Sequence, residues 1–307
     1  MNAMPRIVLA GGSGFLGQLL SSILISKGYE VVVLGRAASQ EAGRVHHVQW
    51  DGKTVGEWRK ALDGVRAVVN LTGKNVNCRH TAENRRAIID SRVNSVRVLG
   101  EAIARSVRPP EVFVQTAGTA IYGDAGDRWC DENAPPGNGF IADVSRAWEG
   151  AFEEVEAPGM RKSLFRLGPV LGPSGGLLEP LAHLTRWFLG GHVGSGQQFF
   201  SWIHIADLMR MFLCAIDRDD IAGVFNAVAP SPVTNAEFMR ELRRALHRPW
   251  SPPVPAFAAK IGAWVMGTDA TLALTGQRCT PTHFLESNLA FEFPNLREAL
   301  ANIFPNQ

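Results

Sequence analysis

Four glycines near the N-terminus have the spacing of a phosphate-binding turn. They are Gly11, Gly12, Gly14 and Gly17, and they match two patterns at once, Gly-x-Gly-x-x-Gly from Gly12 and Gly-x-x-Gly-x-x-Gly from Gly11. A glycine lets the chain leave a strand in a sharp turn. A residue without a side chain also lets a pyrophosphate approach the N-terminus of a helix. The spacing therefore indicates a bound dinucleotide.

The residues on both sides of the glycines support this interpretation. Residues 7–10 form a short apolar run that is typical of a buried strand, and apolar residues recur at helical spacing from Phe15 to Leu24. A strand, a tight turn and a helix open a dinucleotide-binding βαβ unit. The alternative is a glycine-rich loop that binds nothing. The cofactor is expected to contact Gly11, Gly12, Ser13, Gly14, Phe15 and Leu16.

The tip of the second predicted strand bears on which dinucleotide binds. Residues 30–35 are typical of a buried strand, and Arg36 and Ser39 follow them. In NAD sites an acidic residue at this tip binds the ribose 2′-hydroxyl, whereas an arginine accommodates the 2′-phosphate of NADP. Residues 36–39 include no Asp or Glu. We therefore expect NADP, held in part by Arg36 and Ser39; the alternative is that Arg36 is an ordinary solvent-exposed side chain.

Strands and helices alternate over the first half of the chain. Strands are predicted at residues 45–50, 67–71, 112–116 and 163–167, and helices at residues 81–106 and 141–156. The alternation favours an α/β doubly wound parallel sheet, the Rossmann architecture, in which strand ends lie close to the dinucleotide. Further cofactor contacts are therefore expected at Leu71, Thr72, Gly73, Thr116, Leu167 and Val170.

The character of the sequence changes after residue 168. Residues 168–176 form a loop rich in Gly and Pro, residues 190–196 form a Gly-rich loop, and one more strand is predicted at residues 224–228. We expect a dinucleotide-binding domain over residues 1–168, completed by about residues 200–228. Residues 169–307 then form a smaller, mainly helical lobe on the substrate side.

Composition excludes several kinds of partner. The 307 residues include 31 basic and 29 acidic side chains, a net charge of +2, so no basic field favours nucleic acid or an anionic membrane as the main partner. The four cysteines are far apart without a Cys-x-x-Cys pair, which supports neither a metal site nor disulfides. No apolar run reaches the ~20 residues of a membrane span, and no signal segment precedes the glycines. A cytoplasmic protein with a small-molecule substrate is expected.

Several motifs carry a family resemblance. They are the glycine turn, Ile121-Tyr122-Gly123, residues 166–170 (RLGPV) and residues 202–207 (WIHIAD). With them the chain resembles the extended short-chain dehydrogenase/reductases, the class of nucleotide-sugar epimerases and dehydratases. More narrowly, the chain resembles an atypical subgroup called epimerase family proteins. This likeness rests on Ser91-Arg92, residues 146–149 (RAWE), residues 225–230 (FNAVAP) and residues 276–281 (GQRCTP). The resemblance implies a Rossmann lobe that binds NADP and a smaller C-terminal lobe over the nicotinamide.

The resemblance also implies a homodimer. Relatives associate through the two helices predicted at residues 81–106 and 141–156. The apolar residues of the second helix are Val144, Ala147, Trp148, Ala151 and Phe152. We expect this set to be too apolar to be buried by the chain's own sheet; the alternative is that both helices simply cover the core.

The proton relay of the resembled enzymes is missing. Those enzymes use a Tyr-x-x-x-Lys pair, in which the lysine cation lowers the pKa of the phenol. The chain has only two tyrosines, Tyr29 and Tyr122, and neither is followed four residues later by lysine. Aligned through Glu149, Ile141 holds the tyrosine position and Ser145 the lysine position.

Three residues remain as candidate hydrogen-bond donors to a substrate: Tyr122, Thr119 and Arg92. Arg92 occupies the place of the family's usual asparagine, and Thr116 or Thr119 could replace the usual serine. A structural role is the main alternative for Tyr122. The function is therefore predicted as NADP(H) binding with an oxidoreductase or epimerase-like reaction on an unknown substrate. The alternative is a non-catalytic protein whose NADP-loaded state is read by a partner.

Overall fold

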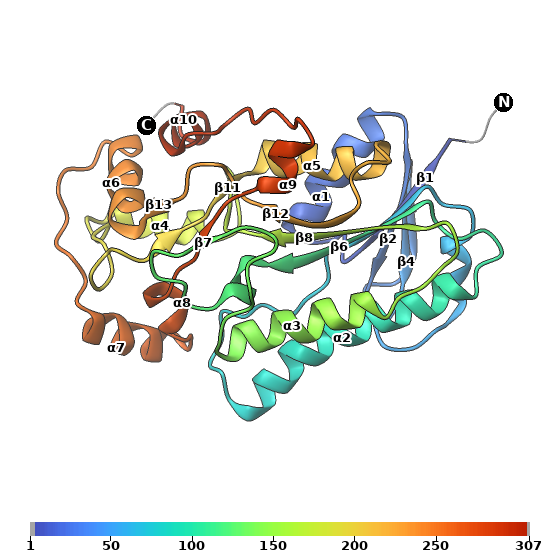
Figure 1. Ribbon diagram of the computed structural model, residues 1–307, viewed down its shortest axis with the longest axis horizontal. Helices are drawn as coiled ribbons and strands as arrows, with labels where there is room; N and C mark the ends of the chain where they lie inside the picture. Colours follow the sequence, from blue (N-terminus) through green and yellow to red (C-terminus); the bar gives the residue numbers. More distant parts are fainter. Residues whose placement is uncertain (1–3, 306–307) are drawn as a thin grey trace.

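An eight-stranded sheet forms the centre of the molecule (Figure 1). The computed structural model describes residues 4–305, except for the side chains of residues 41 and 42. The strand order is β12-β8-β6-β5-β1-β2-β4-β3; all neighbours pair in parallel except β3, which runs antiparallel to β4. The strands are β1 (Arg6–Ala10), β2 (Glu30–Gly35), β3 (Gln40–Ala42), β4 (Val45–Gln49), β5 (Ala67–Asn70), β6 (Val112–Gly118), β8 (Arg161–Leu167) and β12 (Gly223–Ala227). The expected doubly wound Rossmann sheet is confirmed.

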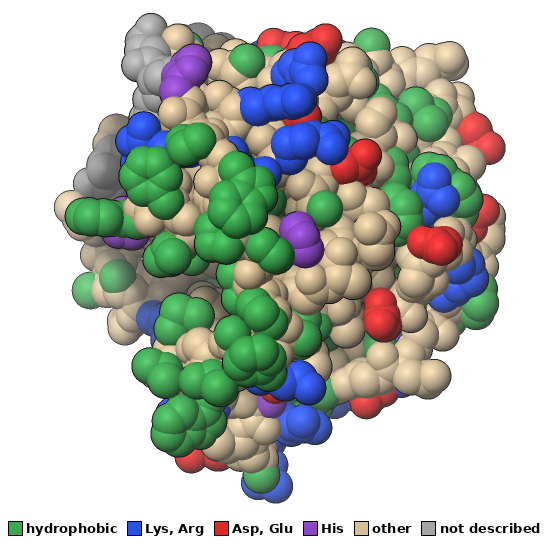
Figure 2. Space-filling model, turned by 90° about the vertical axis from the view of Figure 1, so that its left-hand side faces the viewer, with side chains coloured by type: hydrophobic (Ala, Val, Ile, Leu, Met, Phe, Trp, Pro, Cys, Tyr) green, Lys and Arg blue, Asp and Glu red, His purple; other side chains and the backbone are tan. Residues whose placement is uncertain are grey.

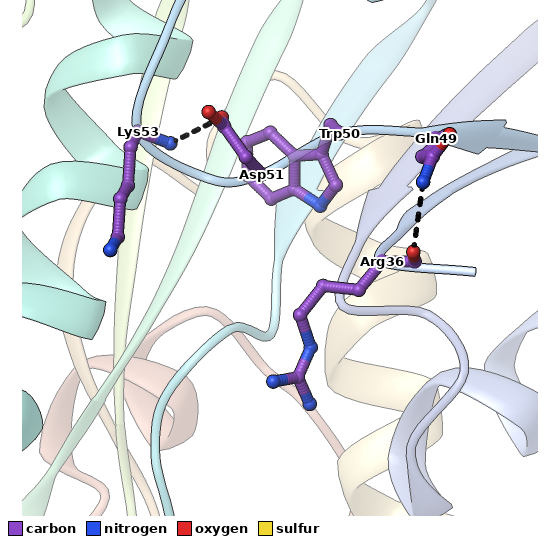
Figure 3. Close-up of a pocket in the computed structure, with 5 residues that line it drawn as sticks. All are labelled: Arg36, Gln49, Trp50, Asp51 and Lys53. Atoms are coloured by element: carbon purple, nitrogen blue, oxygen red, sulfur yellow. Dashed lines mark hydrogen bonds between the residues drawn. The ribbon is translucent and has the colours of Figure 1, made fainter. Parts of the chain in front are cut away.

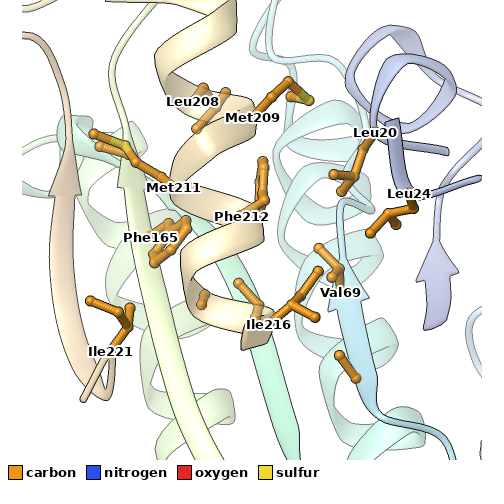
Figure 4. Packing of buried hydrophobic residues seen from close by; sticks show 14 of the residues in the cluster. Leu20, Leu24, Val69, Phe165, Leu208, Met209, Met211, Phe212, Ile216 and Ile221 are labelled. Carbon is orange, nitrogen blue, oxygen red and sulfur yellow. The ribbon is translucent and has the colours of Figure 1, made fainter. Parts of the chain in front are cut away.

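One face of the sheet is covered by α1 (Phe15–Ser26), α5 (Ile205–Asp217) and α9 (Thr282–Glu286). Alternate residues of the strands point to this side, as the two-residue period of a strand requires. Phe165 of β8 meets Phe212 of α5 with ring centroids 5.4 Å apart, and Leu20 and Leu24 of α1 join the same cluster (Figure 4). The cluster fixes α1 against the sheet and so fixes the turn that precedes it.

The opposite face is covered by α2 (Ala82–Ala104) and α3 (Phe140–Glu153). Thr81 caps α2, because its side chain accepts a hydrogen bond from the backbone N–H of Asn84. Trp148, Ala151 and Phe152 of α3 are buried against the chain's own sheet. The expectation that this helix is too apolar for the sheet to bury is therefore wrong. The homodimer itself stays a prediction.

The C-terminal part is mainly helical, as expected. Its helices are α4 (Leu178–Arg186), α6 (Asn235–Ala245), α7 (Ala256–Met266), α8 (Thr271–Leu274) and α10 (Leu296–Ile303). Trp202, Phe238 and Leu242 lie at the centre of a separate apolar cluster that joins α4, α6 and α10. No helix among residues 4–305 is both long and apolar enough to cross a membrane.

Three pairs of very short strands lie outside the central sheet, and the last of them joins the C-terminal part to the first half of the chain. They are β9 (Val170–Leu171) with β11 (Ile203–His204), β10 (Phe199–Phe200) with β13 (Val233–Thr234), and β7 (Trp129–Cys130) with β14 (Arg278–Cys279). The sequence suggests only a loop at residues 129–139. A two-residue strand forms there because residues 278–279 pair with it. That partner lies about 150 residues further along the chain, so no local pattern reveals it.

The start of α1 packs tightly against the glycine turn. A Cβ atom on Gly17 would lie 2.4 Å from the Cα of Gly12, so only glycine allows this approach. Gly17 therefore lets α1 lie close to the turn through which the chain leaves the sheet.

We expect Gly17→Ala to lower the free energy of unfolding by about 1–3 kcal/mol, because the added methyl group must displace backbone rather than a flexible side chain. Gly150→Ala is the matched control, since a Cβ at this position of α3 has no neighbour within 4 Å. The control should gain about 0.5–1 kcal/mol from helix propensity. Urea unfolding monitored by circular dichroism measures both. Equal stability of the Gly17→Ala and parent proteins would contradict the packing argument.

Candidate functional site

The glycine turn leaves the N-terminus of α1 without a cap from the protein. Gly11 adopts a φ of +75°, and Gly14, at the N-cap position, has no side chain to accept a hydrogen bond from the first turn of the helix. That first turn also contains no acidic residue. The free backbone N–H groups and the helix dipole therefore favour an anion beside Ser13 and Gly14, which is what a dinucleotide pyrophosphate requires.

Phe15 and Leu16 contribute packing on the other side of the turn. Both are half-buried and contact the cluster between α1 and α5. The Phe15 ring lies under the Gly-rich loop, within 3.1 Å of where Cβ atoms on Gly172 and Gly175 would stand. Val170 and Leu167 are half-buried in the same cluster. The Phe15 contacts thereby hold the Gly-rich loop next to the glycine turn, although the loop and the turn are far apart in sequence.

Arg36 lies at the carboxyl end of β2, on the rim of an open pocket of about 480 Å³ (Figure 3). The pocket is lined by Arg36, Gln49, Trp50, Asp51 and Lys53. The Arg36 side chain extends away from the strand tip, and no described side chain forms an ion pair with it. The Ser39 oxygen accepts a hydrogen bond from the backbone N–H of Gln49 at 3.0 Å, which ties the tip of β2 to the end of β4.

Lys53 and its neighbours are site residues that the sequence analysis missed. Gly35 and Gln49 are paired in the sheet, so the segment after β4 necessarily reaches the same edge as the tip of β2. Asp51 is an acid in this pocket, but its carboxylate accepts hydrogen bonds from Thr54 and from the backbone N–H of Lys53. These bonds, chiefly those from Thr54, lower the pKa of Asp51 to about 2. The carboxylate is thus held by its own loop, and two cations line the pocket.

A buried polar network holds the carboxyl ends of β5 and β6 together. Thr72 donates a hydrogen bond from its hydroxyl to Ser95 at 2.7 Å or to Asn70 at 2.5 Å. The Thr116 hydroxyl donates to the carbonyl of Asn70 at 2.8 Å, and the Asn70 amide donates to Gln115 at 2.9 Å. The side chains of Thr72 and Thr116 therefore position the carboxyl ends of β5 and β6. The half-buried Leu71 and the exposed Gly73 are then the residues at these strand ends that a ligand can contact.

Arg92 is a half-buried cation that pairs with no carboxylate among the described residues. Its Nη1 donates to the carbonyls of Lys74 at 2.9 Å and Ile88 at 3.1 Å, and the guanidinium lies 4.9 Å from the ring centroid of Trp148. Burial lowers the pKa of Arg92 to about 10, so the group stays charged near neutral pH. It lies against the backbone of Gly73. At this position it can donate a hydrogen bond to a substrate or attract an anion.

Tyr122 is buried, and its hydroxyl group bonds other residues of the protein. The side chain is 1% exposed, and its oxygen lies 2.8 Å from the carbonyl oxygen of Asp131, from Oδ1 of Asn226 and from Nη1 of Arg166. Burial raises the pKa of the phenol well above its usual value. This geometry favours the structural interpretation of Tyr122 over a role as proton donor or base.

The three candidate donors have no partner in common among the described residues. Thr119 is 3% exposed and donates to the carbonyl of Leu167 at a long 3.4 Å. Ser145, at the position of the family's lysine, is buried on α3 with its Oγ 4.0 Å from where a Cβ on Gly118 would lie. Residues 4–305 also contain no group of three His, Cys, Asp or Glu side chains that could hold a metal ion.

We expect Tyr122→Phe to lower the free energy of unfolding by about 1–3 kcal/mol, because Arg166 and Asn226 lose a buried hydrogen-bond partner. Tyr29→Phe is the matched control. The Tyr29 hydroxyl bonds Asp217 at the protein surface, so its loss should cost less than about 1 kcal/mol. Denaturant unfolding of the two variants measures the difference. A Tyr122→Phe protein as stable as the parent would contradict the structural role.

Comparison with known proteins places this geometry in a family. Residues 7–227 match the model of the NAD dependent epimerase/dehydratase family, and residues 254–303 match a domain of unknown function, DUF1731. Epimerase family protein YfhF of Bacillus subtilis is 31% identical over 305 residues, which cover 98% of this chain and 99% of that protein.

Solved structures agree with the sequence matches. The crystal structure of human epimerase family protein SDR39U1 (isoform 2) with NADPH has a TM-score of 0.88 and 32% identity, covering 98% of this chain and all of that one. A UDP-glucuronic acid 4-epimerase from Bacillus cereus has a TM-score of 0.76 at 14% identity, which shows a common fold. The expected family resemblance is confirmed: the chain belongs to the NAD dependent epimerase/dehydratase family, among the SDR39U1-like epimerase family proteins.

Proposed function

We propose that this protein binds NADP(H), with the pyrophosphate at the N-terminus of α1 and the 2′-phosphate in the pocket of Arg36. The observation that carries the proposal is the pair of cations, Arg36 and Lys53, that lines one pocket at the strand edge next to the uncapped glycine turn. A guanidinium binds a phosphate through two parallel hydrogen bonds, and the lysine adds a point charge. The NADPH in the crystal structure of the SDR39U1 relative supports the same cofactor.

The proposal assigns a role to each part of the chain. Residues 1–168, completed by about residues 200–228, form the dinucleotide domain, and residues 169–307 form the smaller lobe beside the nicotinamide. The cofactor then contacts the backbone of Gly11, Gly12, Ser13, Gly14, Phe15 and Leu16. The path toward the nicotinamide is lined by Leu71, Gly73, Leu167 and Val170. The strand ends are held in place by Ser39, Thr72 and Thr116.

We expect Arg36→Ala to weaken NADPH binding by about ten- to a hundredfold, since a hydrogen bond to a charged group contributes about 1.5–3 kcal/mol. NADH has no 2′-phosphate, so its affinity should not change. Isothermal titration calorimetry with both cofactors measures the two constants. Arg105→Ala is the control, because Arg105 ends α2 and pairs with Glu101. Parent protein that binds NADH and NADPH equally would contradict NADP specificity.

The chemical step is proposed to proceed without the Tyr-x-x-x-Lys proton relay that the resembled enzymes use. Ile141 carries no ionisable group, Ser145 carries no cation, and Tyr122 is turned away into the protein. Hydride transfer therefore requires an acceptor that needs only a hydrogen-bond donor, and Arg92 is the donor best placed, beside Gly73. The same observations favour a second candidate function, in which the NADP-loaded protein is recognised by a partner without turnover.

We expect no turnover of nucleotide sugars or simple secondary alcohols, because loss of acid–base assistance costs about 10²–10⁴-fold in rate. NADPH absorbance, followed with carbonyl compounds and alcohols, tests net oxidation or reduction, and chromatography of the sugar nucleotides tests epimerisation, which leaves the cofactor unchanged overall. Both are measured for the parent and for Tyr122→Phe. Both proteins should be equally inactive on these substrates. Robust turnover of a nucleotide sugar by both would show that a relay lies elsewhere in the chain.

A further inference from the structure

The exposed large apolar side chains gather on one side of the C-terminal lobe. Most of those in residues 4–305 belong to two stretches, residues 177–189 and 250–272, and Figure 2 shows them together on one side of the molecule. They include Trp187, Trp250 and Trp264, which are 69%, 73% and 69% exposed. We name these two stretches the apolar face. A contiguous patch of this kind marks an interaction surface.

Helix α7 turns its large apolar side chains outward rather than toward the protein. Phe257, Ile261, Trp264 and Val265 follow the i, i+4, i+7, i+8 spacing of a core-facing stripe, yet each is at least 60% exposed. Its inward side contains small residues such as the buried Ala263. The helix therefore contacts the protein through small residues and presents its apolar stripe to the outside.

This orientation is fixed by contacts with the first half of the chain. Nη2 of Arg79 donates to the carbonyl of Trp264 at 2.9 Å, and Nδ1 of His80 lies 3.2 Å from Oδ2 of Asp269. The backbone bridge between Val193 and Val254 joins the loop of residues 190–196, which follows the first stretch of the apolar face, to the second stretch. The outward stripe of α7 is thus held as a surface by both polar and backbone contacts.

The charges around the apolar face are mostly positive. Lys260 is exposed on α7, the Arg79 guanidinium lies 5.5 Å from the ring centroid of Trp264, and that of Arg248 lies 5.6 Å from the ring centroid of Phe188. The two stretches of the apolar face contain two acidic residues, Asp269 and Glu179. Asp269 is paired with His80, and the carboxylate of Glu179 accepts a hydrogen bond from the backbone N–H of Gly175. Cations on long side chains next to exposed tryptophans match the boundary between lipid headgroups and acyl chains.

We propose that the apolar face binds the surface of a bilayer that contains anionic phospholipids. The α7 stripe and the Trp187–Leu189 segment enter the interface, and Lys260, Arg79 and Arg248 meet the headgroup phosphates. A second copy of the chain fits less well, because a two-fold contact through α7 would bring two Lys260 side chains together without a carboxylate. The net charge of +2 does not reveal this face, since it averages over the whole chain.

Sedimentation of the full-length protein with lipid vesicles tests the proposal. Vesicles of phosphatidylcholine alone are compared with vesicles of equal parts phosphatidylcholine and phosphatidylglycerol. We expect stronger binding to the anionic vesicles, and a loss of about tenfold or more in the partition coefficient for the double variant Ile261→Ser, Trp264→Ser, because burying each apolar side chain contributes to binding. Val107→Ser is the matched control, an 89% exposed apolar residue outside the apolar face.

Several outcomes would overturn the proposal. If the parent protein stays in solution with both kinds of vesicle, the apolar face does not bind a bilayer. If it binds both kinds equally, the cations do not contribute to binding as proposed. A dimer seen by light scattering that disappears in the double variant would assign the face to a second copy instead. If the double variant does not fold, Lys260→Glu serves as the second variant, and its unchanged binding to anionic vesicles would also overturn the proposal.

Discussion

The pairing of Arg166 with Glu149 holds together most of what surrounds the site. The guanidinium and the carboxylate meet through two hydrogen bonds of 2.9 and 2.8 Å, and both side chains are buried. The remaining nitrogen of Arg166 donates to Tyr122 and to the carbonyl of Glu132. One buried cation therefore connects β8, α3, the turn after β6 and the loop before α3. A buried pair of this kind is costly to break, because the partner that remains is left charged and unpaired.

This interaction explains why the cofactor end and the reaction end of the site differ. The cofactor end depends on backbone geometry and on the tips of β2 and β4, which the Arg166 cluster does not touch. At the proposed reaction end, the same cluster surrounds Tyr122, the only phenol near the relevant strand end. Burial raises the pKa of Tyr122, although the Arg166 cation acts in the opposite direction. A general base must titrate near the operating pH and reach its substrate. The packing of Tyr122 prevents both.

The sheet and the glycine turn could be predicted because their signals are local. The strand of residues 67–71 is visible as an apolar run, and Gly11 and Gly17 have a spacing that only one kind of turn requires. Lys53 could not be found in this way, since its place in the pocket depends on β4 lying beside β2. The helical spacing of Phe257, Ile261 and Trp264 predicts a stripe but not its direction. Which side it faces is decided by residues far away, such as Arg79.

Arg92 shows how much of the site's electrostatics depends on tertiary structure. A buried guanidinium normally has a carboxylate partner, because moving a charge out of water costs several kcal/mol. Arg92 has two carbonyl groups and the ring of Trp148 instead, which satisfy hydrogen bonds without neutralising the charge. The positive field therefore remains beside Gly73, and Arg36 and Lys53 supply another at the far pocket. Asp51 also lines that pocket, so its carboxylate offsets one of the two cations there, whereas no described carboxylate pairs with Arg92. An anionic ligand beside Gly73 would therefore gain binding energy from a cation that the protein does not neutralise.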